Sequence, residues 1–267
     1  MRIRFSPETE LFARACHMAQ PGAHIHTDPL ARRLLGEEAC GALATQWSPL
    51  LKKIQVRQCL GWFPARAAWL EAALKTAAAT GARQCLLLGA GYETLPWRQP
   101  EWAGRLTFYE LDAPGIQEEK TRRLQAAGLK DPANLHRGHG DLSQGVGRAL
   151  QALPGFSPGR ITFCWLPDAA LWLSPLHFDR LLGELSLWLP VGSTLAFDLP
   201  RGAGYSPKTL ERLLSRHGDL LYEYADAAGL TGRLYTVCSS GAHSLSAPPG
   251  MAACLAVRHR TVQRKTQ

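Results

Sequence analysis

The sequence predicts an α/β fold: a mostly parallel, seven-stranded sheet that includes one antiparallel strand and follows a helical N-terminal region. Two observations carry this prediction. Several short apolar runs, of which Gln84–Leu88 is the clearest, stop abruptly at a glycine or an acid, as strands buried on both faces do. Segments with helical periodicity separate most of these runs, and such alternation requires a parallel sheet that is covered on both faces.

The N-terminal region has little strand signal and is expected to be helical. Asp28 and Pro29 are typical of a helix start, because aspartate caps the first turn and proline fits there. Residues 64–80 form a second expected helix, in which apolar side chains recur at helical spacing. We expect residues 1–80 to form a helical cap on a core of residues 81–267, with both parts in one domain, 1–267.

The rest of the chain divides into short strands and helices. We expect strands at residues 84–88, 106–112, 134–136, 160–166, 193–199, 232–238 and 252–259. We expect helices at residues 116–127, 174–188, 207–216 and 219–228. No helix separates the last two strands, so they should form a hairpin that inserts one antiparallel strand into the sheet.

Composition limits the class of protein. The 267 residues are 46% hydrophobic and 19% charged, the balance of a folded globular chain. No apolar run reaches the roughly 18 residues of a membrane helix, and the N-terminus lacks the apolar core of a secretory signal. We therefore expect a cytoplasmic protein without membrane contact.

The seven cysteines include no C-x-x-C pair, so we expect no metal site. The net charge of +8 is scattered, which argues against a nucleic-acid partner.

A glycine turn and two acids mark a candidate binding site. The Gly89-Ala90-Gly91 turn follows the first strand, and glycines there let the backbone approach a ligand closely. Asp112 ends the next strand, where an acid can accept hydrogen bonds from both ribose hydroxyls of a nucleoside. Thr94 stands where a dinucleotide fingerprint has its third glycine, which favours a nucleoside without a pyrophosphate. Ligands sit at the carboxyl ends of parallel strands, so Asp141 should face the same crevice.

These segments resemble the leucine carboxyl methyltransferase family. That family carries a G-A-G-x-D-T turn, an E-x-D-x-P strand end and a basic residue soon after. Here the turn reads Gly89-Ala90-Gly91-Tyr92-Glu93-Thr94, the strand end reads Glu110-Leu111-Asp112-Ala113-Pro114, and the basic residue is Lys120. Weaker matches extend the resemblance over residues 25–200. It implies a Rossmann-like class I methyltransferase of the bacterial small-molecule branch, with S-adenosyl-L-methionine as its cofactor.

The resemblance also implies which residues contact the cofactor. The glycine turn would line its methionine portion, Asp112 would bind its ribose, and Asp141 with Leu142 would meet its adenine. Arg66 matches the family's arginine that meets the cofactor carboxylate, a role that suits a bidentate guanidinium. Arg57 is the alternative if the alignment differs there. The expected cofactor-binding set is Arg66, Gly89, Ala90, Gly91, Glu110, Asp112, Asp141 and Leu142.

The chain departs from the family pattern near the expected reaction centre. The family has an acid at the position of Pro167, and only a one-residue shift would let Asp168 replace it. Trp172 stands at a family tyrosine, and the segment after residue 200 diverges. His24 and His26 lie on an expected loop, where a substrate contact or a role as base is open. No catalytic residue is assigned, and the weak candidates are His24, His26, Asp168 and Trp172.

The expected reaction is O-methylation of the carboxylate of a small acid or natural-product intermediate. A carboxylate with a pKa of about 4 is ionised at neutral pH and needs no general base. The positive net charge suits such an anionic acceptor, with Arg98, Arg201 or Arg233 as its partner. Two alternatives stay open: methylation of an amine, hydroxyl or thiol, and a protein that binds S-adenosyl-L-methionine but has lost catalysis.

Overall fold

A computed structural model describes residues 6–21, 24–50, 54–200, 204–230 and 251–261, and within residues 54–59 it describes the backbone only. Its strands are β1 (Gln84–Leu88), β2 (Thr107–Asp112), β3 (Leu135–His139), β4 (Thr162–Leu166), β5 (Thr194–Pro200), β6 (Asp219–Asp226) and β7 (Met251–Arg258). They form one seven-stranded sheet in the order β3-β2-β1-β4-β5-β7-β6.

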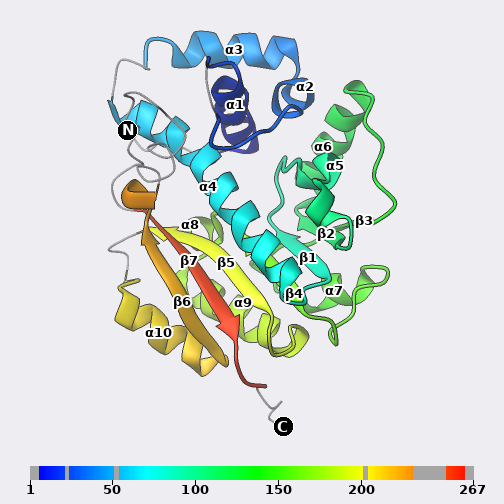
Figure 1. Cartoon of the computed structure of the whole chain (residues 1–267), viewed down its shortest axis with the longest axis vertical. Coiled ribbons are helices and arrows are strands. Elements are labelled where there is room, and N and C mark those ends of the chain that lie inside the picture. The colour runs from blue at the N-terminus through cyan, green and yellow to red at the C-terminus, as the bar shows by residue number, and fades with distance from the viewer. Residues whose placement is uncertain (1–5, 22–23, 51–53, 201–203, 231–250, 262–267) are drawn as a thin grey trace.

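Helices cover both faces of this sheet. They are α1 (Pro7–Met18), α2 (Ala31–Leu35), α3 (Glu37–Trp47), α4 (Ile54–Ala79), α5 (Leu95–Arg98), α6 (Pro114–Ala126), α7 (Gly147–Ala152), α8 (Ala169–Trp172), α9 (Pro175–Trp188), α10 (Pro207–Arg216) and the 3-10 helix η1 (Glu101–Ala103). In Figure 1, α4 crosses the front of the sheet, α9 and α10 lie behind it, and α1 to α3 gather beyond one end. Among the described helices, none is long and apolar enough to span a bilayer.

The direction of the strands confirms the mostly parallel sheet. β1, β2, β3, β4 and β5 pair with one another in parallel, whereas β7 pairs antiparallel with both β5 and β6. In Figure 1 the β5 and β6 arrows point toward the α1 to α3 end, and the β7 arrow points away from it. The carboxyl ends of the parallel strands therefore lie beneath α1, at the edge where α/β sheets bind ligands.

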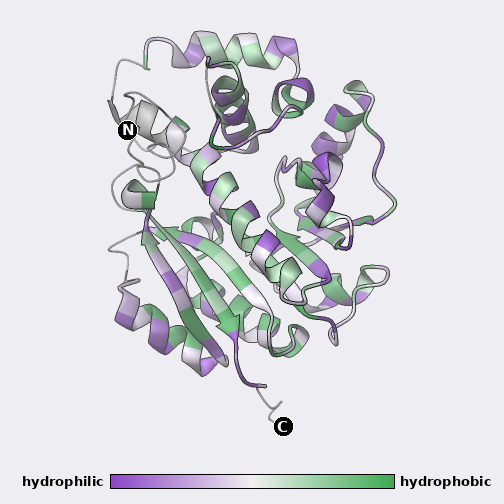
Figure 2. Cartoon of the chain, in the orientation of Figure 1, coloured by the Kyte–Doolittle hydropathy of each residue, from purple (hydrophilic) through white to green (hydrophobic). Residues whose placement is uncertain are grey.

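The core has two layers because side chains alternate along each strand. On β1, Cys85 and Leu87 pack in the layer that contains Trp62 and Leu70 of α4. Leu86 and Leu88 point the other way and pack in a layer built from these α9 and α10 residues: Phe178, Leu181, Leu185, Leu210 and Leu214. In Figure 2 the central strands are mostly green, whereas α6 and α10 carry long purple stretches. Both faces of the central strands are thus buried, as their continuous apolar runs predicted.

Serine caps start three helices. Ser6, Ser174 and Ser206 each accept a hydrogen bond from a backbone N–H one turn ahead, and proline occupies the first turn of α1, α9 and α10. A serine cap satisfies an otherwise unpaired donor, and proline tolerates that position because it has no N–H to lose. The capped start of α1 lies over the carboxyl end of the sheet, where Ser6 and Pro7 line a crevice with the turn after β1.

Several boundaries differ from those predicted. Residues 219–226 form the strand β6 rather than a helix. Leucine and alanine favour a helix locally, but pairing with β7 and a buried ion pair between Asp219 and Arg258 hold this segment in the sheet. The strand predicted at 232–238 lies outside the described residues. Pro64, predicted as a helix start, lies inside α4, and the helix predicted from Asp28 begins at Ala31.

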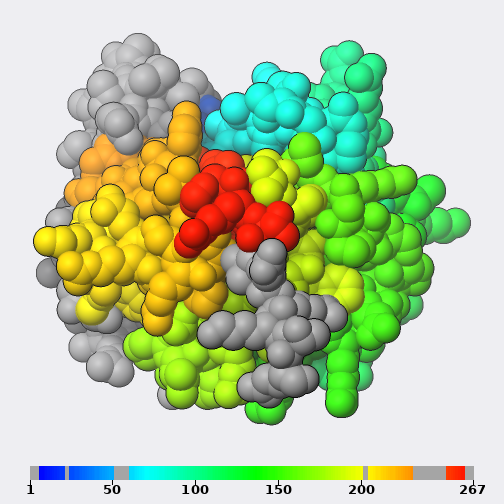
Figure 3. Space-filling view, turned by 90° about the horizontal axis from the view of Figure 1, so that it is seen from below, coloured from blue at the N-terminus to red at the C-terminus, as the bar shows by residue number. Residues whose placement is uncertain are grey.

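The amino ends of the parallel strands face the opposite side of the molecule. Figure 3, the view from below, shows this side with the end of β7 in red. The red segment reaches the surface between the yellow and orange region of α10 and β6 and the green region that includes α7.

Candidate functional site

The turn after β1 takes a conformation that requires glycine. Gly89 and Gly91 have φ values of 75° and 49°, in the left-handed region where side chains are strained. The Gly89 N–H donates to the Leu111 carbonyl at 2.8 Å, which ties the turn to β2. A Cβ atom on Gly91 would lie 3.5 Å from Pro7 of α1. The turn therefore presents bare backbone to the space beneath α1.

A crevice of about 610 Å³ occupies that space. Its walls come from the first turn of α1, the turn after β1, the end of β2, the loop after β3 and the segment after β4. Of the residues predicted from the sequence, those that line it are Gly89, Ala90, Gly91, Asp112, Asp141, Leu142, Asp168 and Trp172. The structure thus brings the glycine turn, both acids and two of the catalytic candidates to one place.

Asp112 forms no salt bridge among the described residues, although the charge of Lys120 acts on it, and the backbone holds its carboxylate in place. Its carboxylate accepts hydrogen bonds from the N–H groups of Gly91 and Ala113, both at 2.7 Å. Burial raises the pKa of Asp112, and these two hydrogen bonds oppose that shift. The result is a fixed carboxylate that faces the crevice.

Arg66 lies behind the crevice wall rather than in it. This fully buried guanidinium is surrounded by three acids from three elements. Its Nη1 donates to Asp168 and to Asp198, each at 2.8 Å, and its Nη2 lies 2.8 Å from Glu10 of α1. Nε and Nη2 nevertheless have no well-aligned hydrogen-bond acceptor among the described residues. Arg57, the alternative, has a side chain outside the described residues.

Glu110 also lies outside the crevice. It is fully buried, and both of its carboxylate oxygens accept from Lys120 Nζ, at 2.8 and 2.9 Å. The ammonium group of Lys120 lies 4.7 Å from the centre of the Trp97 ring. We expected Glu110 to contact the cofactor, but its position outside the crevice does not support such a contact. It forms instead a buried pair that ties β2 to α6.

Asp168 has a left-handed backbone, with φ at 55°, directly after Pro167 at the end of β4. Aspartate tolerates this conformation better than most residues, and it is common near functional sites. The Asp168 N–H donates to Asp198 at 2.7 Å, which holds the carboxylate over Arg66. Burial raises the pKa of Asp168, the charge of Arg66 opposes the shift, and Asp198 and Glu10 add to it.

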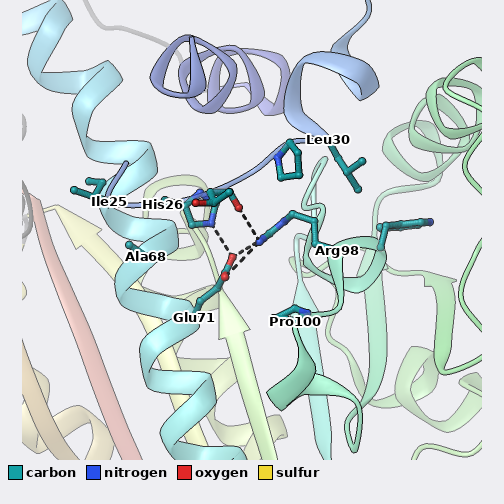
Figure 4. Close-up of a pocket in the computed structure, with 10 residues that line it drawn as sticks. Ile25, His26, Leu30, Ala68, Glu71, Arg98 and Pro100 are labelled. Carbon is teal, nitrogen blue, oxygen red and sulfur yellow. Dashed lines mark hydrogen bonds and ion pairs between the residues drawn. The ribbon is translucent and has the colours of Figure 1, made fainter. Parts of the chain in front are cut away.

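The two histidine candidates lie away from this crevice. His24 contacts the carbonyl of Gln20 at 3.0 Å. His26 lines a second cavity of about 630 Å³ between α4, α5 and the 24–30 loop, where its Nε2 lies 2.8 Å from Glu71 (Figure 4). Neither histidine lines the crevice that Asp112 faces. A substrate contact or a role as base, both open for these histidines, therefore has no support from their positions.

Of the arginines predicted to hold an anionic acceptor, only Arg98 is described, and it does not line the crevice. Arg98 points into the second cavity and pairs there with Glu71 (Figure 4). It also pairs with Glu93. Arg201 and Arg233 lie outside the described residues. Among the described residues that line the crevice there is no lysine, arginine or histidine.

Sequence reasoning missed the contribution of α1. Glu10 lines the crevice, and Arg14, one turn later, donates to Glu93 at 2.9 Å. Burial would raise the pKa of Glu93, but the charges of Arg14 and Arg98 hold it well below its usual range. The Ser6 cap signals where α1 starts, yet no local pattern shows that α1 packs over the carboxyl edge of the sheet.

Solved structures resemble this chain in fold. A DUF574 family protein from Streptomyces avermitilis matches with a TM-score of 0.53 and 14% identity, over 94% of this chain and 97% of that one. A protein from Thermobifida fusca, provisionally titled a methyltransferase, matches with a TM-score of 0.50 and 18% identity, over 85% and 92%. At these identities the likeness concerns the fold alone.

Curated relatives are closer in sequence. A protein of Mycobacterium marinum is 30% identical over 218 residues, which are 80% of this chain and 67% of that protein. One from Mycobacterium tuberculosis is 31% identical over 188 residues, 70% of this chain and 58% of that protein. Both carry the provisional name of S-adenosyl-L-methionine-dependent methyltransferase. The alignments span 58% to 67% of these relatives.

A family model also matches the chain. The model described as leucine carboxyl methyltransferase matches residues 8–186, which run from α1 through most of α9 and include all the crevice residues except Ser6 and Pro7. This range is more than half of the chain and contains the glycine turn, Asp112, Arg66 and Asp168. The chain belongs to the leucine carboxyl methyltransferase family.

Proposed function

We propose that this methyltransferase transfers a methyl group from S-adenosyl-L-methionine to a small-molecule acceptor in the crevice beneath α1. One observation carries the proposal: the glycine turn, Asp112 and Asp141 line a single crevice at the carboxyl ends of three adjacent strands. The provisional names of the relatives support this choice of methyl donor.

The crevice has a wall suited to each part of the donor. Two backbone amides fix the Asp112 carboxylate where it can accept hydrogen bonds from two ribose hydroxyls. Asp141 and Leu142 offer a polar and an apolar contact for adenine on the next strand. The bare Gly89-Ala90-Gly91 backbone leaves room for the methionine portion.

Arg66 is proposed to bind the carboxylate of the donor. The support is that Nε and Nη2 are buried without aligned acceptors, and an incoming carboxylate would supply them. Glu10 now pairs with Nη2, so it must turn aside, and it is then free to meet the ammonium group of the donor. Arg66→Lys should weaken S-adenosylhomocysteine binding much more than adenosine binding, because only the former carries that carboxylate.

The bound donor supplies an electrophilic methyl group on a positively charged sulfur. The residues of the chain must orient the acceptor, exclude water and hold any proton that the acceptor releases. Asp168 lies in the crevice wall and is the described carboxylate best placed for the last of these tasks.

The acceptor is open between two classes. The family and the net charge of +8 support an anionic acceptor. In that case the enzyme forms a methyl ester on a carboxylate. The described wall favours a non-carboxylate acceptor, because it has acids but no basic side chain. Product analysis with a labelled methyl group and mild alkaline hydrolysis separates these classes. An ester releases the label as methanol, whereas N-methyl and ether products keep it.

Calorimetry with S-adenosylhomocysteine tests the proposal as a whole. We expect micromolar binding of this ligand and no binding of NAD, because the turn lacks the third glycine that suits a pyrophosphate. NAD binding in place of S-adenosylhomocysteine would contradict the proposal.

A further inference from the structure

Asp168 and Trp172 offer a charge and a ring on the same side of the crevice. Asp168 directly precedes the one-turn helix α8, and Trp172 ends that helix four residues later. The two residues stand at opposite ends of this one-turn helix, and both side chains line the crevice. A ligand that passes along α8 can therefore touch the carboxylate with one end and the indole with its body.

The charge beneath Asp168 is not balanced. One guanidinium, that of Arg66, serves the carboxylates of Glu10, Asp168 and Asp198, which come from α1, the start of α8 and β5. Each of the three carboxylates lies 2.8 Å from a nitrogen of that group. Two negative charges in the cluster remain uncompensated, and a buried carboxylate in this situation favours a nearby cation or a proton.

The described wall carries acids and no basic side chain. Asp112 and Asp141 add two carboxylates to those of Glu10 and Asp168, whereas Glu93 already pairs with Arg14 and Arg98 behind the wall. The sulfonium, ammonium and carboxylate groups of the methyl donor together carry one positive charge, which offsets only part of this. A second anion in the crevice would meet repulsion, whereas a cationic ligand would meet complementary charge.

Trp172 is unusually exposed for its size. It is 63% exposed, and Leu176 at the start of α9 is 68% exposed. Most exposed apolar residues need no explanation, but an open indole face in a crevice wall is a ready platform for an aromatic ring. The same face attracts a cation held within about 6 Å.

Resting on the proposed function, we propose that the methyl acceptor is an arylalkylamine. Its ring packs on Trp172, and its ammonium group pairs with Asp168. The ammonium gives one proton to the Asp168 carboxylate, and the freed nitrogen lone pair bonds the methyl carbon. The carbon–sulfur bond breaks with its electron pair on sulfur, which yields S-adenosylhomocysteine and a methylated ammonium. The proton on Asp168 then leaves to solvent.

Three matched probes test this proposal by binding rather than by turnover. They are 2-phenylethylamine, 2-phenylethanol and 3-phenylpropionate, which present an aromatic ring with a cationic, neutral or anionic end. Calorimetry at pH 7.5 uses the full chain saturated with S-adenosylhomocysteine. We expect the amine to bind at least tenfold more tightly than the alcohol, and the acid to bind most weakly.

Two variants separate the carboxylate from the ring. Asp168→Asn should reduce the affinity for the amine to that for the alcohol, because the neutral amide removes only the charge. Trp172→Ala should weaken the amine and the alcohol by the same factor. Asp131→Asn and Tyr222→Ala are the matched controls, since these residues lie outside the crevice, and both should leave all three affinities unchanged.

The outcomes are distinguishable. Acid binding equal to amine binding in the unaltered chain overturns the proposal without any variant, as does an amine preference that survives Asp168→Asn. If none of the probes binds while S-adenosylhomocysteine does, the acceptor class is wrong and the proposed function stands. Failure of S-adenosylhomocysteine itself to bind overturns both.

Discussion

Two buried ionic clusters lie close to the same crevice and differ in their balance of charge. Beneath β2, Lys120 and Glu110 match one cation with one anion, and both oxygens of the acid are used. Beneath β4, Arg66 stands alone among Glu10, Asp168 and Asp198. The matched pair lies behind the wall, whereas two acids of the unmatched cluster line it.

The difference separates a structural role from a binding role. A matched buried pair satisfies itself and needs nothing from outside, so it serves to join elements. An unmatched cluster retains uncompensated negative charge. Binding of a proton or a cationic ligand to this cluster then stabilises the protein. We infer that an excess of acid around one arginine marks a place where ligands are expected, and the following experiments test this difference.

The largest effect is expected at Arg66. Arg66→Met should lower the free energy of unfolding by about 3–5 kcal/mol, because it leaves buried carboxylates without any cation. Denaturation in urea measures the change. Adding Asp198→Asn should recover only part of the loss, since Glu10 and Asp168 remain. Complete recovery in that double variant would show that a single acid, and not three, depends on Arg66.

Asp112 is expected to affect binding rather than folding. Asp112→Ala removes two charge-assisted hydrogen bonds to ribose, each worth about 1.5–3 kcal/mol, so the affinity for S-adenosylhomocysteine should fall at least about 100-fold. Calorimetry beside Asp131→Ala, whose acid lies outside the crevice, measures the loss. Undiminished affinity would show that the ribose assignment is wrong.

The matched pair should be replaceable as a unit. The double variant Glu110→Leu with Lys120→Met should stay within about 1 kcal/mol of the original stability, because well-packed apolar residues often substitute for a buried ion pair. Lys120→Met alone is the control and should be much less stable. A large additional loss in the double variant would mean that the pair does more than join β2 to α6.

The smallest effect concerns pH. The pKa of Asp168 is raised in the folded protein, so its stabilising contribution is present below its ordinary pKa of about 4 and is lost as pH rises through the folded value. Asp168→Asn should therefore gain stability relative to the original chain as pH rises from 4 to 8. Urea denaturation across that range measures the difference. A stability gain of Asp168→Asn that grows as pH falls would contradict this prediction.

Sequence patterns predicted the strands that are buried along their whole length. They failed where pairing with a distant strand determines the secondary structure. The runs at β1 and β4 are apolar on both faces and could be recognised locally. β6 could not, because its exposed Leu220 and Tyr222 alternate with residues that fit a helix equally well. Only the distant β7, which pairs along its whole length, selects the extended form.

The residues of the site divide in the same way, into those that a local pattern predicts and those that only packing brings together. The glycine turn and Asp112 belong to consecutive strands, and a fixed spacing along the chain reveals them. Glu10 comes from a helix that reaches the crevice by packing, so no spacing connects it to Arg66. His24 and His26 are weak candidates on residue type alone, and neither lines the crevice, while His26 lines the second cavity.

The position of β7 has a consequence for the order in which the protein is made. β6 is translated before β7, yet it contacts β5 only through β7, which lies between them. During synthesis β6 therefore has no neighbour in the sheet until residues 251–258 have left the ribosome. Its exposed edge must wait unpaired in the meantime, when a nascent chain is most open to wrong strand partners.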